Sequence, residues 1–218
     1  MKFLLILLSF SFTSLLANGQ SQNQYNEKNM LEIPKTNVEI PEGYEIATLG
    51  SGCFWCIEAI YQELNGVDKV KSGYSGGHIA SPTYRQVTNG TTGHAEVIQF
   101  LFDPKILTFS EILEIFWSTH DPTTLNRQGA DVGPQYRSAV FYHSDSQKQE
   151  AEFFKKKLDD AGAFNRPIVT EITPFSNFYV AEDYHQNYFK DNGMQPYCQI
   201  VVRPKVEKFK KVFAEKLK

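Results

Sequence analysis

The sequence predicts a single α+β domain, a small mixed sheet flanked by helices, over residues 44–218. Strand-like and helix-like patterns follow one another without the strict alternation that marks a parallel α/β fold. The region holds about 175 residues, which suits one domain with a sizeable core. It contains no internal repeat and no low-complexity tract, so the pattern does not call for a second domain.

The first elements of this domain are two strands and a helix. A strand is predicted over residues 44–49, and it leads into Gly50-Ser51-Gly52. Apolar residues then recur at helical spacing, so a helix begins at about Cys53. A second strand, over residues 96–102, is apolar on both faces and should therefore lie in the centre of the sheet.

The remaining elements follow from capping and periodicity. Thr108 and Glu111 form a T-x-x-E capping box before a helix that should end near His120. The other predicted elements are strands over 137–143, 168–173 and 199–204, a helix over 146–161 closed by Gly162, and a terminal helix over 203–218 with Val206, Phe209 and Phe213 facing inward. Residues 73–92 and 121–135 fit neither pattern, and long ordered loops of this kind tend to carry function.

The N-terminal part of the sequence has the architecture of a secretory signal. Lys2 precedes an apolar run over residues 3–16, and small residues follow at Ala17 and Gly19. The run is shorter than the roughly 18 to 20 residues that span a bilayer, which disfavours a membrane anchor. We therefore expect a signal peptide over residues 1–19 and an exported, soluble protein, either periplasmic or extracellular. Residues 20–43 are polar and predict a linker.

Charge and cysteine content narrow the class of protein. The net charge of −3 is too small to imply a polyanionic partner, so we expect no nucleic-acid binding. Three cysteines do not fit the dense, evenly counted framework of a disulfide-stapled exported domain. The thiols are therefore expected to be reactive.

Cys53 is the best candidate for a nucleophile. At the first turn of a helix it faces backbone N–H dipoles that favour a thiolate, and Gly50 and Gly52 allow close approach of the backbone. The adjacent Phe54 and Trp55 could wall a pocket for a small apolar group.

The C-x-x-C spacing of Cys53 and Cys56 leaves several kinds of chemistry open. A disulfide could close between the two thiols after attack, as in a thioredoxin-like exchanger. A zinc site would need a second ligand pair, for which only Cys198 and scattered histidines are present. A cysteine hydrolase would need a histidine base, and five candidates are dispersed along the chain without a local motif: His78, His94, His120, His143 and His185.

Six short blocks in one order resemble the peptide methionine sulfoxide reductase A family. They are Gly52–Trp55, Pro82–Arg85, Thr92–Val97, Asn126–Gly129, Gln135–Ser138 and Ala181–Gln186. The resemblance extends from about Glu45 to Lys210. It implies a two-layer sandwich related to the ferredoxin-like class and thiol-dependent reduction of methionine S-sulfoxide, the repair of oxidised proteins, with no metal and no organic cofactor.

The resemblance also implies a role for individual residues. Cys53 attacks the sulfoxide sulfur, and Glu96 supplies the proton for the departing oxygen, with a pKa raised by its place on a mainly apolar strand. Tyr84 and Tyr136 donate hydrogen bonds to that oxygen. The remaining implied site residues are Asp131, which holds a water, Phe54 and Trp55, which cage the substrate methyl group, and His185 and Tyr188, which support the site.

Regeneration of the enzyme requires a second thiol that condenses with a sulfenic acid on Cys53. Cys56 is one helical turn away, although a disulfide within one turn would strain that turn. Cys198 resembles a C-terminal recycling cysteine of the family, but here no glycine-rich tail follows it. We expect Cys56 to resolve first, with Cys198 as alternative or relay.

The expected partners follow from the same chemistry. The reductant is thioredoxin or an exported dithiol relative, the substrates are oxidised proteins or peptides, and the enzyme is expected to be a monomer. A binding module that only recognises oxidised methionine would also need such a pocket. An acid at Glu96 with phenols at Tyr84 and Tyr136 distinguishes the reductase from it.

Overall fold

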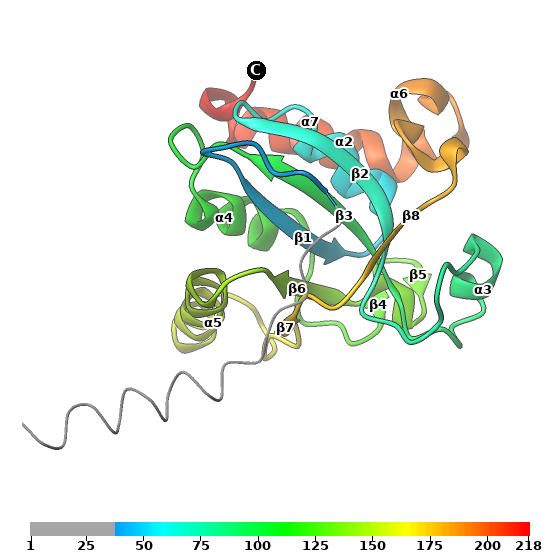
Figure 1. The fold of residues 1–218 in the computed structure, drawn as a ribbon, viewed down its shortest axis with the longest axis horizontal. Coiled ribbons are helices and arrows are strands. Elements are labelled where there is room, and N and C mark those ends of the chain that lie inside the picture. The colour runs from blue at the N-terminus through cyan, green and yellow to red at the C-terminus, as the bar shows by residue number, and fades with distance from the viewer. Residues whose placement is uncertain (1–37) are drawn as a thin grey trace, which may run out of the picture. The chain divides into compact units, whose positions relative to one another are not determined.

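The computed structural model describes residues 38–218, so the predicted signal peptide and most of the predicted linker lie outside the described residues. A curved sheet with helices packed along it forms the body of this part of the chain (Figure 1). Its strands are β1 (Glu45–Ser51), β2 (Val67–Ser75), β3 (Ala95–Phe102), β6 (Ser138–Tyr142), β7 (Glu171–Pro174) and β8 (Phe178–Val180), with a separate two-stranded pair β4 (Arg127–Gln128) and β5 (Asp131–Val132). The helices are α2 (Phe54–Tyr61), α3 (Tyr84–Thr88), α4 (Phe109–Thr119), α5 (Asp145–Asp160), α6 (Tyr188–Asn192) and α7 (Arg203–Val212), with short turns η1 (Pro134–Tyr136), η2 (Asp183–His185), η3 (Cys198–Val202) and η4 (Ala214–Lys216).

The six-stranded sheet has the order β7-β6-β1-β3-β2-β8. Only the β6–β7 pair is parallel among the described strands, so the sheet is mixed as predicted. Every residue of β3 is buried, which confirms its predicted central place. The predicted α+β class is therefore confirmed.

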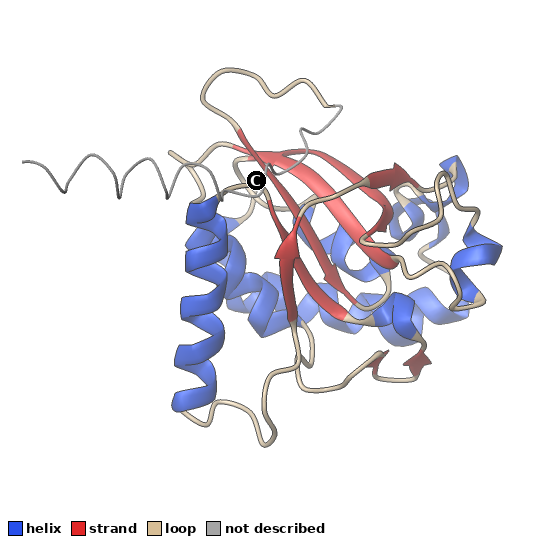
Figure 2. Cartoon of the chain, turned by 60° about the horizontal axis from the view of Figure 1, so that its bottom comes forward, coloured by secondary structure: helices blue, strands red, loops and turns tan. Residues whose placement is uncertain are grey.

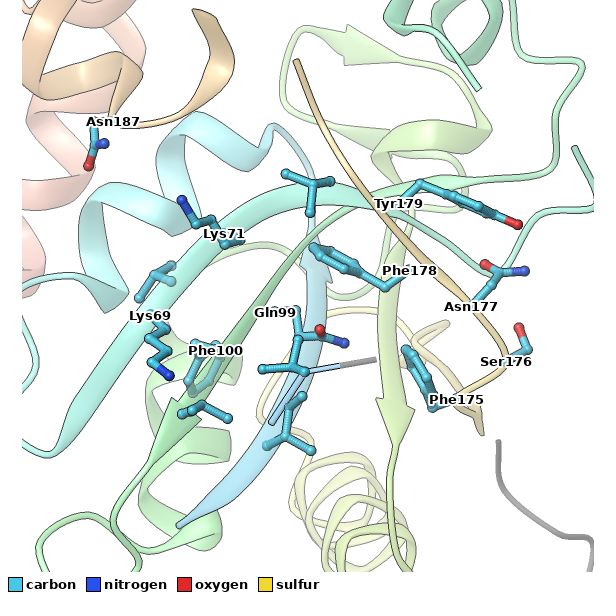
Figure 3. Close-up of a pocket in the computed structure, with 15 residues that line it drawn as sticks. Lys69, Lys71, Gln99, Phe100, Phe175, Ser176, Asn177, Phe178, Tyr179 and Asn187 are labelled. Carbon is cyan, nitrogen blue, oxygen red and sulfur yellow. The ribbon is translucent and has the colours of Figure 1, made fainter. Parts of the chain in front are cut away.

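Two apolar clusters lie on the two faces of the sheet. The larger cluster joins the helix-facing side chains of β1 and β3 to α2, α4 and α7, and Figure 2 shows these helices on one face. The smaller cluster lies on the opposite face, where Phe175 and Phe178 cover Val97 and Phe141. A groove of about 950 Å³ opens on that face, and Figure 3 shows Phe175 and Phe178 beside Gln99 in it.

Most predicted elements are confirmed with small shifts at their ends. The Thr108–Glu111 capping box is present at the start of α4, with both reciprocal hydrogen bonds, and His120 follows the helix as its C-cap. The terminal helix buries Val206, Phe209 and Phe213, as expected from their spacing. The strand predicted over 168–173 begins later, at Glu171.

The strand predicted over residues 199–204 is wrong. Residues Cys198–Val202 form one π-helical turn that continues into α7. Cys198, Val202 and Val206 are buried at a spacing of four residues, so packing of one helical face overrides the strand preference of the β-branched residues. Pro204 lies in the first turn of α7, directly after the π-helical turn.

The two unassigned segments contain short elements. Residues 73–92 include the end of β2 and helix α3, whose N-cap Thr83 forms a capping box with Gln86. Residues 121–135 include the β4–β5 pair and the start of η1. Both segments border the end of the sheet at which α2 begins, and they form part of the site described next.

Candidate active site

Cys53 lies at the junction between β1 and α2, as its N-cap residue. The preceding Gly52 has a φ of 92°, and a Cβ there would lie 2.6 Å from the side chain of Gln128. Glycine is therefore required both by the backbone conformation and by the close approach of the β4–β5 segment. Cys53 itself is 5% exposed.

Burial changes the expected chemistry of this thiol. The pKa of Cys53 is raised above its usual value because the thiol is desolvated, and the helix N-terminus does not offset this. The expectation of a ready thiolate in the free enzyme is therefore wrong. Cys56, whose N–H donates to the Cys53 carbonyl at 3.1 Å, shares a side-chain hydrogen bond with Cys53 that lowers the pKa of Cys56.

Glu96 on β3 lies at the start of α2, beside Cys53. Its Oε2 accepts a hydrogen bond from the backbone N–H of Phe54 at 3.1 Å, and the side chain is 1% exposed. Burial raises the pKa of Glu96 well above its usual value, and negative charge on Cys53 raises it further. A protonated carboxyl is thus favoured whenever Cys53 is a thiolate.

Two tyrosine hydroxyls face the same place. Tyr84 begins α3 and Tyr136 ends η1, and both side chains are partly buried. Burial raises the pKa of each phenol, and the charges of Glu96 and Cys53 contribute in both cases. Both phenols therefore remain protonated donors, directed by two separate loops at one site.

Asp131 joins this site through a residue that the sequence analysis missed. Its Oδ2 accepts a hydrogen bond from the Tyr197 hydroxyl at 2.8 Å. Tyr197 also hydrogen-bonds with Cys53 and Cys56 and packs edge-on against Trp55, with ring centroids 5.6 Å apart. Its position directly before Cys198 was the one available sequence signal.

Trp55 is held by the two residues predicted to support the site. Its indole N–H donates to His185 Nδ1 at 3.1 Å, and its ring stacks on Tyr188 at 3.7 Å. Burial lowers the pKa of His185, so the ring is neutral and accepts this hydrogen bond. Phe54 is fully buried, whereas Trp55 is partly exposed, so Trp55 is the more accessible of the two rings.

Two carboxylates behind the aromatic residues were also missed. Glu58 on α2 accepts the backbone N–H groups of Asn187 and Tyr188, at 3.0 and 3.3 Å. It thereby fixes Asn187, which has a positive φ of 55°, and sets the start of α6. Glu182 accepts hydrogen bonds from Tyr74 and Tyr84. Glu182 lies inside one of the six blocks, which was its only sequence signal.

Cys198 lies in the interior of the domain. It is fully buried at the start of η3, and burial raises the pKa of its thiol. All three cysteines are free thiols. Cys198 belongs to the same buried cluster as Cys53 and Cys56.

The histidines do not provide a base for Cys53. The rings of His94, His120 and His143 hydrogen-bond to Ile79, Ser138 and Thr48, respectively. Within residues 38–218, Cys53 has no hydrogen bond with a histidine ring, which leaves the hydrolase interpretation without support from the geometry.

The residues that a zinc site would have needed do not come together in the part of the chain that the structure describes. Among these residues, no group of three or more histidine, cysteine, aspartate or glutamate side chains is arranged to hold a metal ion. None of the helices within residues 38–218 is long and apolar enough to cross a membrane.

Comparison with known proteins identifies the family to which the sequence is similar. The family model described as peptide methionine sulfoxide reductase matches residues 45–217. The chain is 53% identical over 171 residues to a peptide methionine sulfoxide reductase MsrA of Natronomonas pharaonis, covering 78% of this chain and 96% of that one. It is 55% identical over 168 residues to the MsrA of Leptospira borgpetersenii, covering 77% and 94%.

Solved structures agree with the sequence comparison. The reduced form of Mxr1 from Saccharomyces cerevisiae superposes with a TM-score of 0.68 at 34% identity, covering 77% of this chain and 96% of that one. Methionine sulfoxide reductase A of Corynebacterium diphtheriae gives 0.64 at 36% identity, covering 71% and 78%. The chain therefore belongs to the peptide methionine sulfoxide reductase family, as an oxidoreductase of the peptide-methionine (S)-S-oxide reductase class.

Proposed function

We propose that Cys53 is the nucleophile and Glu96 the acid in the reduction of methionine S-sulfoxide. Cys53, as its thiolate, attacks the sulfoxide sulfur and forms an S–S bond, and Glu96 transfers a proton to the sulfoxide oxygen. The S–O bond then breaks, and the oxygen leaves as water after it has also taken up the proton released by the Cys53 thiol. A water molecule next attacks the Cys53 sulfur, which breaks the S–S bond, frees methionine, returns a proton to Glu96 and leaves Cys53 as a sulfenic acid. The observation that supports this most directly is the buried Glu96 carboxyl beside Cys53. Because Oε2 accepts the Phe54 N–H, Oε1 is the oxygen that holds the proton.

The phenols of Tyr84 and Tyr136 donate to the sulfoxide oxygen as its negative charge grows. Donors aimed at developing charge in a water-poor site stabilise the transition state more than the ground state. Asp131, held by Tyr197, is the group that orients a water or a polar part of the substrate. Phe54 and Trp55 contact the methyl group and thereby select the S epimer, while His185 and Tyr188 fix the ring of Trp55.

Cys56 is the first resolving thiol. It already shares a side-chain hydrogen bond with Cys53. Attack of the Cys56 thiolate on the sulfenic acid forms the Cys53–Cys56 disulfide and releases water. Cys198 then accepts the disulfide as a relay. A dithiol donor, thioredoxin or an exported relative, reduces it by thiol–disulfide exchange, and the enzyme works as a monomer on oxidised proteins or peptides.

A single-turnover experiment tests this assignment. The mature enzyme is mixed with an S-methionine-sulfoxide peptide without reductant, and the products and disulfides are mapped by mass spectrometry. We expect a Cys53–Cys56 bridge to form with the first methionine, and a second methionine per enzyme as Cys198 takes over the disulfide and frees Cys53. Cys198→Ser should keep the first methionine and the Cys53–Cys56 bridge but lack the second methionine, and Cys56→Ser should keep one methionine but accumulate a dimedone-reactive sulfenic acid. A full Cys53–Cys198 bridge in Cys56→Ser at the wild-type rate would assign resolution to Cys198, and no methionine from the wild-type enzyme would overturn the function.

Export is the second part of the proposal. The Lys2-led apolar run and the small residues at Ala17 and Gly19 support cleavage after about residue 19, which leaves the polar linker at the new N-terminus. The donor would then have to act in an oxidising compartment. N-terminal sequencing of the protein from its native host, after cell fractionation, should find a start near Gln20 outside the cytoplasm. An intact Met1 in the cytoplasm would contradict export.

A further inference from the structure

Glu182 lies between β8 and η2, and both of its carboxylate oxygens have partners from the walls of the site. Oε1 accepts the backbone N–H of Tyr84 at 2.8 Å, and Oε2 accepts the Tyr74 hydroxyl at 2.9 Å. His185 Nε2 lies 4.0 Å from the same Oε2. A single carboxylate therefore contacts a helix, a strand and a turn that are distant in the sequence.

The contact with Tyr84 fixes helix α3. This helix has only five residues, and so short a helix has little stability of its own. Thr83 and Gln86 cap each other, but the N–H of Tyr84 is satisfied by Glu182. The place of the Tyr84 hydroxyl in the site therefore depends on the Glu182 carboxylate.

The contact with Tyr74 fixes a buried side chain that lies next to Glu96 and Phe54. Tyr74 is fully buried, pairs with Glu96 across strands β2 and β3, and has its ring 5.9 Å from that of Phe54. Neighbours paired across two antiparallel strands project to the same face of the sheet. Tyr74 thus lies beside both Glu96 and Phe54, and the hydrogen bond to Glu182 determines the direction of the Tyr74 hydroxyl.

The third contact of the Glu182 carboxylate is with the ring of His185. Because Nδ1 of the neutral ring accepts the Trp55 N–H, its proton is on Nε2, on the side of Glu182. No hydrogen-bond partner of Nε2 lies within the described residues, so the negative charge of Glu182 is its nearest compensation. Burial opposes ionisation of Glu182, but the hydrogen bonds from Tyr84 and Tyr74 prevail and lower the pKa of Glu182, which keeps it ionised.

We propose that Glu182 is a positioning residue of the reductase, which acts mainly through Tyr84 and also orients Tyr74 and the His185–Trp55 pair. The inference rests on the proposed function, since it assigns Tyr84 to the sulfoxide oxygen. An ionised carboxylate offers acceptors on both sides, whereas an amide of the same shape offers one acceptor and one donor. Glu182→Gln replaces one acceptor by a donor with almost no change in volume: an NH₂ group that faces the Tyr84 N–H removes that hydrogen bond, and one that faces Tyr74 reverses the direction of the hydrogen bond to its hydroxyl.

A double-mutant cycle tests the proposal. The variants are Glu182→Gln, Tyr84→Phe and both together, with Asp183→Asn as a control at the exposed neighbouring position. We expect Glu182→Gln to lower kcat about tenfold or more, because a mispositioned donor no longer meets the oxyanion. In the Tyr84→Phe background the same change should lower kcat about threefold or less, because the hydroxyl that it positions is absent. Asp183→Asn should leave kcat and KM unchanged.

Two results would overturn the inference. One is a Glu182→Gln enzyme with the wild-type kcat, and the other is an equal loss in both backgrounds, which would mean that Glu182 does not act through Tyr84. Melting temperature and the rate of Cys53 alkylation, measured on all variants, separate this effect from general unfolding. Absence of methionine from the wild-type single turnover refutes the proposed function and the positioning role together. Either of the two contrary results with a normal methionine yield refutes the positioning role alone.

Discussion

The carboxyl group of Glu96 accepts a hydrogen bond from the N–H of Phe54, the first residue of helix α2, whose N-cap is Cys53. The proposed acid and the proposed nucleophile therefore meet at the same helix N-terminus, Glu96 through a hydrogen bond and Cys53 through the chain.

Glu96→Gln should lower kcat about 10²- to 10⁴-fold, the range usual for loss of a general acid, while Cys53 remains alkylatable. Burial raises the pKa of Glu96, so the acid is present below that pKa and lost as the pH rises through it. The wild-type kcat should therefore fall on the alkaline side, and the residual activity of Glu96→Gln should lack this limb. Glu114→Gln, at an exposed position on α4, serves as the control in a pH–rate measurement. Turnover at the wild-type rate in the Glu96→Gln enzyme would show that Glu96 is not the general acid.

Tyr136→Phe should lower kcat about 10²-fold with little change in KM, since a donor to the developing oxyanion acts in the transition state. The measurement is steady-state turnover of a methionine S-sulfoxide peptide. Tyr142→Phe is a matched control, because that ring is buried on β6 but lies outside the site. A rise in KM at constant kcat would instead assign Tyr136 to substrate binding.

Gly52→Ala should destabilise the protein by about 3 kcal/mol or more and abolish activity. The added Cβ meets the side chain of Gln128 at 2.6 Å, in addition to the strain of a left-handed backbone. Gly162→Ala, where φ is 59° and no atom lies within 4 Å of the Cβ, should cost only about 1–2 kcal/mol. Urea unfolding of both variants provides the comparison. Equal losses would show that the contact with Gln128 relaxes freely.

Stability should fall as the pH drops below about 6.5, the ordinary pKa of histidine. Burial lowers the pKa of His120 to about 4, so the unfolded chain binds a proton that the folded chain refuses between these two values. The stabilisation is complete above pH 6.5 and is lost as the pH falls through 4, by about 3 kcal/mol for this group. Urea unfolding at pH 7.5 and pH 4.5 should show a smaller pH effect in His120→Gln. His78→Gln, at an exposed histidine, should behave as the wild type.

The elements that could be predicted from the sequence are those whose signal is local. The Thr108–Glu111 capping box and the largely apolar β3 each depend on neighbouring residues, and both are present. The strand predicted over residues 199–204 is absent. Burial of Cys198 and Val202 against the core favours a helix there, although the β-branched residues of the segment prefer a strand. Strand β2 was missed because its charged residues and the bulge between Asp68 and Lys71 break the alternation.

The same division applies to the candidate site. Cys53, Glu96 and Trp55 lie in short recognisable blocks, and the structure brings them together with Tyr84 and Tyr136. Tyr197 and Glu182 were missed because their importance comes only from contacts over a long sequence separation, 66 residues to Asp131 and 98 to Tyr84. The raised pKa of Cys53 was also beyond reach, because the degree of burial is a property of the assembled fold.

The C-terminal residues form backbone hydrogen bonds with the segment that directly follows helix α2. Leu64 forms a bridge with Leu217, Asn65 N–H donates to Lys216, and Lys218 N–H donates to Glu63. Helix α2 is synthesised early, but its packing against α7 and this bridge can form only after residues 203–218 have emerged. During synthesis the helix that carries Cys53 therefore lacks this packing partner until the last residues of the domain have been added.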